Sequence, residues 1–222
     1  MPYVHAQERN KTSSDVLFTD SEGASFVRQG GSRAWRNNNP GNLRYTPFSQ
    51  AQGAIGKAGG FAVFPDYQAG HEALKALLQT DTYSGLTIEK AVKRYAPPSE
   101  NGTEAYKKNL KKITGLDIER LLGKLNADEL ESVVRAIEKL EGTISGKEQA
   151  IARVVGTVID KGRIVSYVLD GNLGTVGKAR AVEMALSGQL DAVVVAGKSG
   201  PYLRSRPDLA VVNNFDALAM AA

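Results

Sequence analysis

The stretch AWRNNNPGNLRY, residues 34–45, sets three asparagines in a row before a Pro-Gly pair. Asparagine and glycine tolerate left-handed backbone, the residue before a proline is pushed out of helix, and asparagine side chains bond to nearby backbone. The stretch therefore predicts a tight loop of several turns. Aromatic and basic side chains flank it with the stacking surfaces and donors that a carbohydrate or nucleotide site needs: Trp35, Arg36, Arg44 and Tyr45. Two interpretations stay open here, a loop that serves only the backbone and the wall of a binding site.

The segments on either side of this loop predict strands and turns. Residues 1–20 are polar, with few core residues, and predict a flexible N-terminal segment. FTDSEGASFVRQGGSRAW, residues 18–35, predicts a β-hairpin that turns at Glu22. After the loop, residues 49–60 are rich in glycine and alanine and predict a further loop, and FAVF at 61–64 predicts a short strand.

Between residues 60 and 142 the apolar spacing becomes that of helices. The predicted helices are one around Leu74, Leu77 and Leu78, one over 88–95 behind a Thr87 N-cap, one beginning at Thr103, one over 118–125, and one over 126–140 that starts with a capping box of Asn126 and Glu129. We therefore expect several short helices around one basic cleft.

The composition changes at GTISGKEQA, and we place a domain boundary at 142–146. Beyond it, IARVVGTVID and RIVSYVLDG are β-branched runs that meet at Asp160-Lys161-Gly162, a strong hairpin signal. A short helix over 177–187, with Val182 and Leu186 inward, and a buried strand LDAVVVAG follow. The prediction is an α+β chain with a flexible segment over 1–20, a mostly α domain with a small N-terminal β-hairpin over 21–142, and a small ββαβ domain over 147–222.

The composition excludes several classes of enzyme. The chain has 222 residues and no cysteine, which excludes disulfides, thiolate nucleophiles and zinc held by cysteine. Only His5 and His71 are present, so a Ser-His-Asp triad would depend on His71, and a zinc site of several histidines is not expected. No apolar run approaches the ~18 residues of a membrane span, and the N-terminus lacks the hydrophobic core of a signal peptide. We expect synthesis in the cytoplasm, no membrane span, no metal and no cofactor.

The net charge of +4 has a definite location. Residues 88–125 hold nine basic and five acidic residues, and this difference of four positive charges equals the net charge of the whole chain. A basic face suits an anionic polymer such as nucleic acid or bacterial cell wall, and a solvated helix face is the alternative. Nucleic-acid binding is not expected, because few aromatic residues interleave with these lysines and no nucleic-acid motif is present.

A second stretch, RYAPPSENGTEAYKK at residues 94–108, holds a candidate catalytic carboxyl. Its two prolines end the preceding helix and place Glu100 in a loop between helices, beside Tyr95 and Tyr106. Aromatic walls that exclude water would raise the pKa of Glu100 and suit a general acid. Alternatively, Glu100 is an acidic residue near a helix N-terminus, which would lower its pKa.

WRNNNPGNLRY, FAVFPDYQAGHEALKALL and YAPPSENGTEAY, in this order, resemble a family of phage-derived and bacterial proteins often labelled virion structural proteins. In that family the Asn-Asn-Pro-Gly-Asn motif opens the domain, and the resemblance covers residues 31–113. The same region is more distantly similar to the lysozyme-like glucosaminidases of autolysins and flagellar hydrolases. Together the resemblances imply a lysozyme-like domain that acts on peptidoglycan.

In those glucosaminidases the catalytic glutamate lies upstream of the Asn-Leu segment, at the end of a helix. Here the comparable residue is Glu22, which falls in the predicted hairpin turn, so Glu100 is the preferred acid. Glu22, Asp66 and Glu104 are the reserve carboxylates, although Asp66 also fits a turn and Glu104 the first turn of a helix. His71 is expected to be a surface or cap residue. The residues expected to hold the acid's loop or line the sugar cleft are Trp35, Arg36, Asn39, Asn42, Tyr95, Asn101, Thr103 and Tyr106.

LDAVVVAGKSGPYLRSRPD followed by NNFDAL resembles a small domain of unknown function, over about residues 150–218. Tyr202, Arg204 and Arg206 could bind a ligand or a delivery partner there, and folding and docking are the alternative roles. The whole chain is expected to cleave peptidoglycan as a muramidase, glucosaminidase or lytic transglycosylase. We expect the protein to be either a type VI secretion effector, with a cognate immunity protein, or a phage-associated lysin, with a tail component as partner. In either case it would act in the periplasm or cell wall, after export or lysis. The alternative is a non-catalytic wall-binding or virion structural protein.

Overall fold

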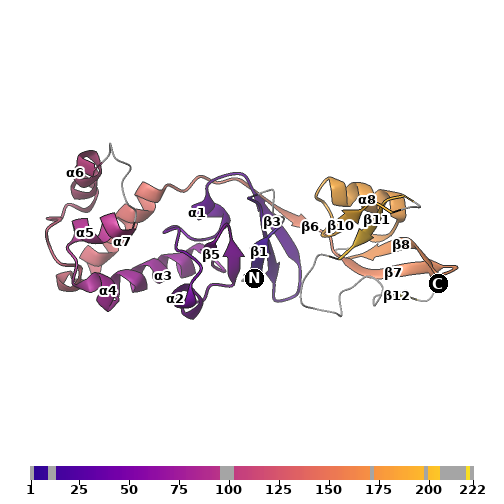
Figure 1. Ribbon diagram of the computed structural model, residues 1–222, viewed down its shortest axis with the longest axis horizontal. Coiled ribbons are helices and arrows are strands. Elements are labelled where there is room, and N and C mark those ends of the chain that lie inside the picture. The colour runs from indigo at the N-terminus through magenta and orange to yellow at the C-terminus, as the bar shows by residue number, and fades with distance from the viewer. Residues whose placement is uncertain are drawn as a thin grey trace. The chain divides into compact units, whose positions relative to one another are not determined.

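The computed structural model describes residues 3–9, 14–95, 103–170, 173–197, 200–205 and 219–220. The chain mixes helices and strands, so the predicted α+β class is confirmed (Figure 1). It divides into two compact units, residues 1–18 with 28–147 and residues 19–27 with 148–222. No helix in these described ranges is long and apolar enough to cross a membrane.

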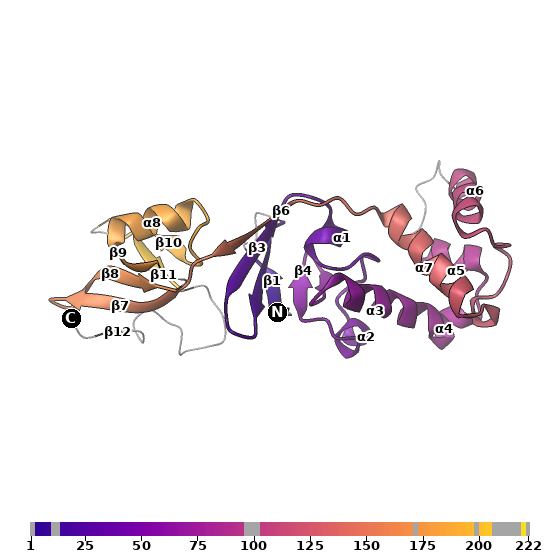
Figure 2. The same cartoon turned by 180° about the vertical axis from the view of Figure 1, so that it is seen from behind.

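The first sheet has six strands in the order β5-β4-β1-β2-β3-β6. The strands are β1 Tyr3–Glu8, β2 Val16–Asp20, β3 Ser25–Gln29, β4 Gly56–Ala58, β5 Phe61–Val63 and β6 Lys147–Ile151. β1 lies beside β4 (Figure 2) and pairs with it in parallel. β4 pairs with β5 in antiparallel orientation. Gly56 is required at this pairing, because a Cβ there would lie 1.7 Å from the carbonyl oxygen of Ala6.

Two strands lie in the segment over residues 1–20 that we expected to be flexible. Within its described part, β1 and β2 are ordered strands, and Val16 and Phe18 are fully buried. The predicted hairpin turn is confirmed, since Asp20 Oδ1 accepts hydrogen bonds from the N–H groups of Glu22 and Ala24. Apolar side chains in a short strand are buried by neighbouring strands. The polar composition of this segment gave no indication of such neighbours, so the strands were not predicted.

The helices of the first unit follow the order expected from the apolar spacing, with additions. They are α1 Arg33–Arg36, α2 Pro47–Ala51, α3 Tyr67–Gln79, α4 Asp81–Ser84, α5 Ile88–Tyr95, α6 Thr103–Thr114, the 3₁₀ turn η1 Leu122–Lys124 and α7 Ala127–Glu141. α2 and β4 lie in the region predicted to be a loop. α7 begins with the predicted capping box, in which Asn126 and Glu129 exchange hydrogen bonds of 3.0 Å.

Residues 118–125 do not form the predicted helix. Their backbone pairs instead with the segment at the start of α5. The N–H of Ile88 donates to the carbonyl of Arg120 at 2.9 Å, and the N–H of Leu122 donates to the carbonyl of Leu86 at 2.9 Å. These bonds use backbone groups that a helix over 118–125 would need, and they satisfy an N–H in the first turn of α5.

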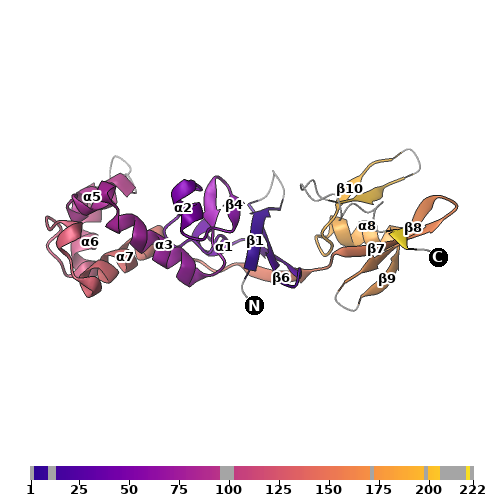
Figure 3. The same cartoon turned by 90° about the horizontal axis from the view of Figure 1, so that it is seen from below.

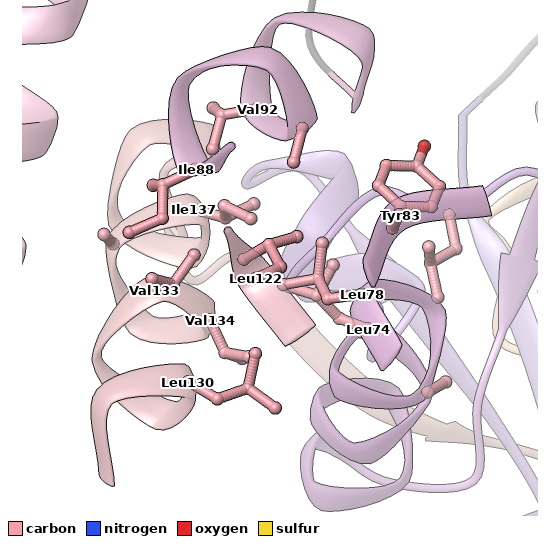
Figure 4. Packing of buried hydrophobic residues seen from close by; sticks show 14 of the residues in the cluster. Leu74, Leu78, Tyr83, Ile88, Val92, Leu122, Leu130, Val133, Val134 and Ile137 are labelled. Carbon is pink, nitrogen blue, oxygen red and sulfur yellow. The ribbon is translucent and has the colours of Figure 1, made fainter. Parts of the chain in front are cut away.

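The core of the first unit forms where α3, α5 and α7 meet (Figure 4). Leu74 and Leu78 from α3, Ile88 from α5, and Val133 and Ile137 from α7 are each at most 1% exposed. Burial of each such side chain contributes about 2 kcal/mol, so this contact holds the helices in place. The candidate site lies on this scaffold.

The second unit packs one helix against short strands (Figure 3). Its elements are β7 Val154–Asp160, β8 Arg163–Leu169, β9 Gly174–Gly177, α8 Lys178–Leu186, β10 Val193–Val195, β11 Tyr202–Arg204 and β12 Ala219–Met220. One sheet has the order β12-β7-β8-β9, and β10 pairs with β11. The predicted ββαβ order is present, and β9, β11 and β12 add to it.

The β7–β8 hairpin turns at Lys161 and Gly162, with φ of 48° and 74°, which agrees with the predicted turn. In α8 Val182 is buried, as expected. Leu186, expected to point inward, is 73% exposed, and Met184 takes an inward position instead. Leu186 is the last residue of α8, where the apolar face no longer lies over the strands.

Candidate functional site

The three consecutive asparagines of the opening stretch are structural. Asn37, Asn38 and Asn39 are at most 6% exposed. Their side-chain amides donate to carbonyl groups of the segment around β5, including those of Ala62 and Phe64 at 2.9 to 3.4 Å. The side-chain amides thereby fasten the loop to the segment around β5.

Asn39 was expected to bind substrate, and the structure corrects this. Its side chain is fully buried and makes three hydrogen bonds. Nδ2 donates to the carbonyls of Leu43 and Ala62, each at 2.9 Å, and Oδ1 accepts from the N–H of Leu43 at 2.8 Å. A side chain engaged in this way closes the turn and has no surface to offer a ligand.

Trp35 and Arg36 also have structural partners, and neither lines the cleft described below. Arg36 Nη1 donates to the carbonyls of Gly30 and Gly31 at 2.9 and 2.6 Å, and burial lowers its pKa. The Arg28 guanidinium lies 4.9 Å from the Trp35 ring centre and donates to the Trp35 carbonyl at 2.8 Å. Both predicted substrate residues therefore fasten the chain where it enters the loop.

Asn42 behaves differently from the three buried asparagines. Its backbone has a φ of 49°, and its Nδ2 donates to Oε2 of Glu141 at 2.7 Å. Its Oδ1 is buried, with no hydrogen-bond partner among the described residues. Glu141 is the last residue of α7, and Gly142, with a φ of 72°, caps the end of this helix. The loop and the end of the longest described helix thus meet through one polar pair.

A cleft of about 450 Å³ opens at this pair. Asn42, Glu141, Tyr83 and Tyr95 are among its lining residues, so two of the predicted substrate residues, Asn42 and Tyr95, come together. Gly41 permits the approach of Tyr95, because a Cβ on Gly41 would lie 2.8 Å from the Tyr95 hydroxyl. The lining combines aromatic faces with amide and carboxylate groups.

Two arginines and one phenylalanine form another part of the same wall. Phe61 of β5 and Arg44 pair across an isolated antiparallel bridge. The guanidinium carbons of Arg33 and Arg44 lie 3.8 and 4.2 Å from the centre of the Phe61 ring. Both arginines are exposed and line the cleft. The cleft therefore has a carboxylate at Glu141 and two positive charges at Phe61.

The predicted catalytic carboxylates have different positions. Glu100 and Asn101 lie outside the described residues, and Tyr95, which lines the cleft, is the last described residue before them. Asp66 is the N-cap of α3 and accepts from the N–H of Ala69 at 2.8 Å, which is the turn role considered for it. Glu22 is exposed in the hairpin turn of the second unit.

The remaining predicted residues lie in α6. This helix begins at Thr103, as predicted, and it includes Glu104 and Tyr106. The side chains of these three residues lie outside the part of the chain that the structure describes. Their predicted roles in the acid's loop and in the sugar cleft therefore stay predictions.

His71 is not the surface or cap residue that the sequence suggested. It is 3% exposed and lies between two carboxylates of α7. Its Nδ1 is 2.8 Å from Oε1 of Glu138, and its Nε2 is 3.2 Å from Oε2 of Glu131. Tyr67 donates its hydroxyl to Glu138 at 2.7 Å, and Lys75 donates to Glu131 at 3.3 Å. This polar network joins α3 to α7.

The network shifts the pKa of two of its members. Burial raises the pKa of Tyr67 to about 12, and the hydrogen bond to Glu138 and its charge add to the effect. Burial of Glu131 works toward a higher pKa, but the hydrogen bond from Lys75 and the charge of His71 outweigh it and lower the pKa.

Part of the basic charge is neutralised within the first unit. Lys107 of α6 lies 2.9 Å from Oε1 of Glu89, which also accepts from Lys93. Hydrogen bonds from Lys93 and Lys107 lower the pKa of Glu89 to about 2. Lys111 and Lys112 are exposed.

Sequence reasoning missed Glu141, Arg33, Phe61 and Tyr83 as cleft residues. Glu141 and Asn42 are 99 positions apart, so no local pattern joins them. One indirect signal for Glu141 was present in the sequence: it is the last residue of α7, the helix whose N-terminal capping box was the clearest in the sequence.

No family model matches the chain, and a search of curated proteins finds no match.

Proposed function

We propose that the cleft binds the glycan strands of bacterial peptidoglycan and that the protein cleaves a glycosidic bond there. The first unit is, in this proposal, a lysozyme-like domain with muramidase, glucosaminidase or lytic transglycosylase activity. The observation that carries the proposal is the hydrogen bond between Asn42 and Glu141 inside an aromatic-walled cleft. The proposal also rests on the resemblance of motifs in residues 31–113 to the phage-derived family and, more distantly, to the lysozyme-like glucosaminidases.

The cleft has the chemistry that a sugar strand requires. A sugar ring offers an apolar face of C–H groups and an edge of hydroxyl groups. Tyr83 and Tyr95 present aromatic surface, and Asn42 and Glu141 present hydrogen-bonding groups to the same space. The volume of about 450 Å³ lies within the range typical of ligand pockets.

Cleavage requires a carboxylic acid that protonates the leaving oxygen. Glu100 has this role in the proposal, as the sequence predicts. Glu141 is the second carboxylate, and Asn42 holds it at the cleft by the 2.7 Å hydrogen bond. A carboxylate there can stabilise positive charge at the anomeric carbon or orient a water molecule.

The test is the incubation of purified peptidoglycan with wild type, Glu100→Gln and Glu141→Gln, with products identified by mass. We expect wild type to release muropeptides, Glu100→Gln to lose about a thousand-fold of the rate, and Glu141→Gln to lose about a hundred-fold. Glu183→Gln, an exposed carboxylate of α8 that does not line the cleft, is the matched control and is expected to cleave like wild type. Anhydro ends on the products would identify transglycosylation, and reducing ends would identify hydrolysis.

The same experiment distinguishes glycan cleavage from the non-catalytic alternative. If wild type releases no muropeptides but sediments with cell-wall sacculi, the cleft holds glycan without cutting it, as a wall-binding or virion structural module would. If only Glu100→Gln cleaves at the wild-type rate, the proposed acid is wrong and the glycosidase proposal stands. Genes for lysis, for a secretion machine or for a small immunity-like partner beside this gene would distinguish a phage lysin from an exported effector.

A further inference from the structure

The wall formed by Arg33, Phe61 and Arg44 is the feature of the cleft that the proposed cleavage does not use. Both guanidiniums lie against one ring, at 3.8 and 4.2 Å from its centre. Neither arginine forms an ion pair with a carboxylate in the described parts of the chain, whereas Arg120 and Arg153 each do. Two positive charges are thus held beside one ring, and no carboxylate of the described residues forms an ion pair with either.

The stacking fixes the guanidiniums and leaves their donors available. A guanidinium that lies against an aromatic ring keeps its N–H groups in its own plane, where they can donate to a planar acceptor. Arg44 is held further by its backbone bridge to Phe61, and Arg33 lies in α1 directly after its N-cap, Ser32. The pair is therefore prepared for an anionic group before a ligand arrives.

The charges of the cleft also favour one orientation of a bound anionic ligand. Glu141 repels an anionic substituent from its part of the cleft, and the two arginines attract one to theirs. A carboxylate accepts hydrogen bonds from a guanidinium fork in bidentate geometry, and it would reduce the repulsion between the two cations. A neutral saccharide would leave both arginines without such an acceptor.

We propose that Arg33 and Arg44 form a carboxylate-binding subsite, so that the cleft selects an acidic saccharide strand over a neutral one. The inference rests on the proposed glycan-binding function and names the chemical class of the ligand. The carboxylate belongs either to the sugar itself, as an ether-linked acid, or to a peptide attached to the strand. The ligands of the test distinguish these two sources.

The experiment measures equilibrium binding of the full-length protein to four soluble ligands. They are glycan strands freed of peptide, the same strands with their carboxylates converted to amides, strands that retain their peptides, and neutral chitin oligosaccharides. We expect wild type to bind the peptide-free acidic strands at least about ten-fold more tightly than the amidated ones. Tight binding of only the peptide-bearing strands would assign the carboxylate to the peptide.

The decisive variant is Arg33→Gln with Arg44→Gln. It is expected to bind acidic and amidated strands equally, while Arg33→Lys with Arg44→Lys recovers part of the preference through charge alone. Lys147→Gln with Arg163→Gln removes the same charge from exposed positions outside the cleft and is expected to keep the full preference. Thermal unfolding of each variant reports whether its fold is retained, and each single arginine variant provides a second test.

The outcomes separate this inference from the proposed function. Equal binding of the acidic, amidated and peptide-bearing strands by wild type, or an undiminished preference in the Arg33/Arg44 double glutamine variant, would overturn the carboxylate subsite and leave glycan cleavage standing. A charge preference without any released product would support the subsite and remove the enzymatic proposal. Failure of wild type to bind any of the four ligands would overturn both.

Discussion

Asn42 donates a hydrogen bond to Glu141 at 2.7 Å, across 99 positions of sequence. The pair joins the asparagine-rich loop to the end of α7. Asn42 uses one polar atom of its amide for this bond, and the other is buried without a partner among the described residues. An asparagine that serves only its own turn would have no need of either feature.

Removal of the Asn42 amide tests its role at the cleft. Asn42→Gly keeps the left-handed backbone, with a φ of 49° in wild type, and removes the donor to Glu141. We expect muropeptide release to fall about ten-fold to a hundred-fold with a small change in thermal stability. Release at the wild-type rate would show that Glu141 does not depend on this amide.

Asn39 is expected to affect stability and not catalysis directly. Asn39→Ala leaves the carbonyls of Leu43 and Ala62 and the N–H of Leu43 without their side-chain partner in a fully buried position. The free energy of unfolding, measured with urea, is expected to fall by about 3 kcal/mol. A stable variant that had lost only glycan binding would restore Asn39 as a ligand residue.

Tyr67 gives a dependence on alkaline pH. Its pKa is raised to about 12 in the folded protein, above the ordinary value of 10.0, so its stabilising contribution is complete below pH 10 and is lost toward pH 12. Tyr67→Phe removes the hydrogen bond to Glu138, and we expect a loss of up to about 1 kcal/mol at pH 7. The difference in unfolding free energy between wild type and variant should disappear as the pH approaches 12. A difference that does not change with pH would contradict the role of this hydrogen bond.

Glu89 gives the opposite dependence, at acid pH. Its pKa is lowered to about 2 from the ordinary 4.5, so its contribution is complete above that ordinary value and is lost as the pH falls toward 2. Glu89→Gln removes the ion pair with Lys93 within α5 and the ion pair with Lys107 that joins α5 to α6. Urea unfolding is expected to show a loss of about 1 kcal/mol at pH 7 that shrinks on acidification. An undiminished loss at pH 2 would mean that packing, and not charge, explains the effect.

Local signals predicted those parts of the fold that depend on neighbours in sequence. The capping box of Asn126 and Glu129 located α7, and the turn at Lys161-Gly162 located the β7–β8 hairpin. The strands in residues 1–20 were missed because their burial comes from distant partners, as the pairing of β1 with β4 shows. The segment 118–125 has helical spacing, but its backbone bonds to the start of α5 outweigh that spacing.

The candidate site also has residues that the sequence identified and residues that only the fold shows. The sequence identified the asparagine-rich loop and Tyr95, but asparagine chemistry is the same in a turn and in a cleft, so it could not separate Asn39 from Asn42. Only the fold shows that Asn39 is enclosed by backbone and that Asn42 reaches Glu141. The sequence identified Arg44 as a donor beside the loop. It could not show that Arg44 and Arg33 stack on the same ring, because this depends on the pairing of Arg44 with Phe61.

The most direct measurement is the mass analysis of soluble products from purified peptidoglycan, with wild type and Glu141→Gln at equal concentration. Our account predicts that wild type releases muropeptides with cleaved glycosidic bonds and that Glu141→Gln releases them about a hundred-fold more slowly. Intact glycan strands after incubation with wild type, or equal rates for the two proteins, would contradict it.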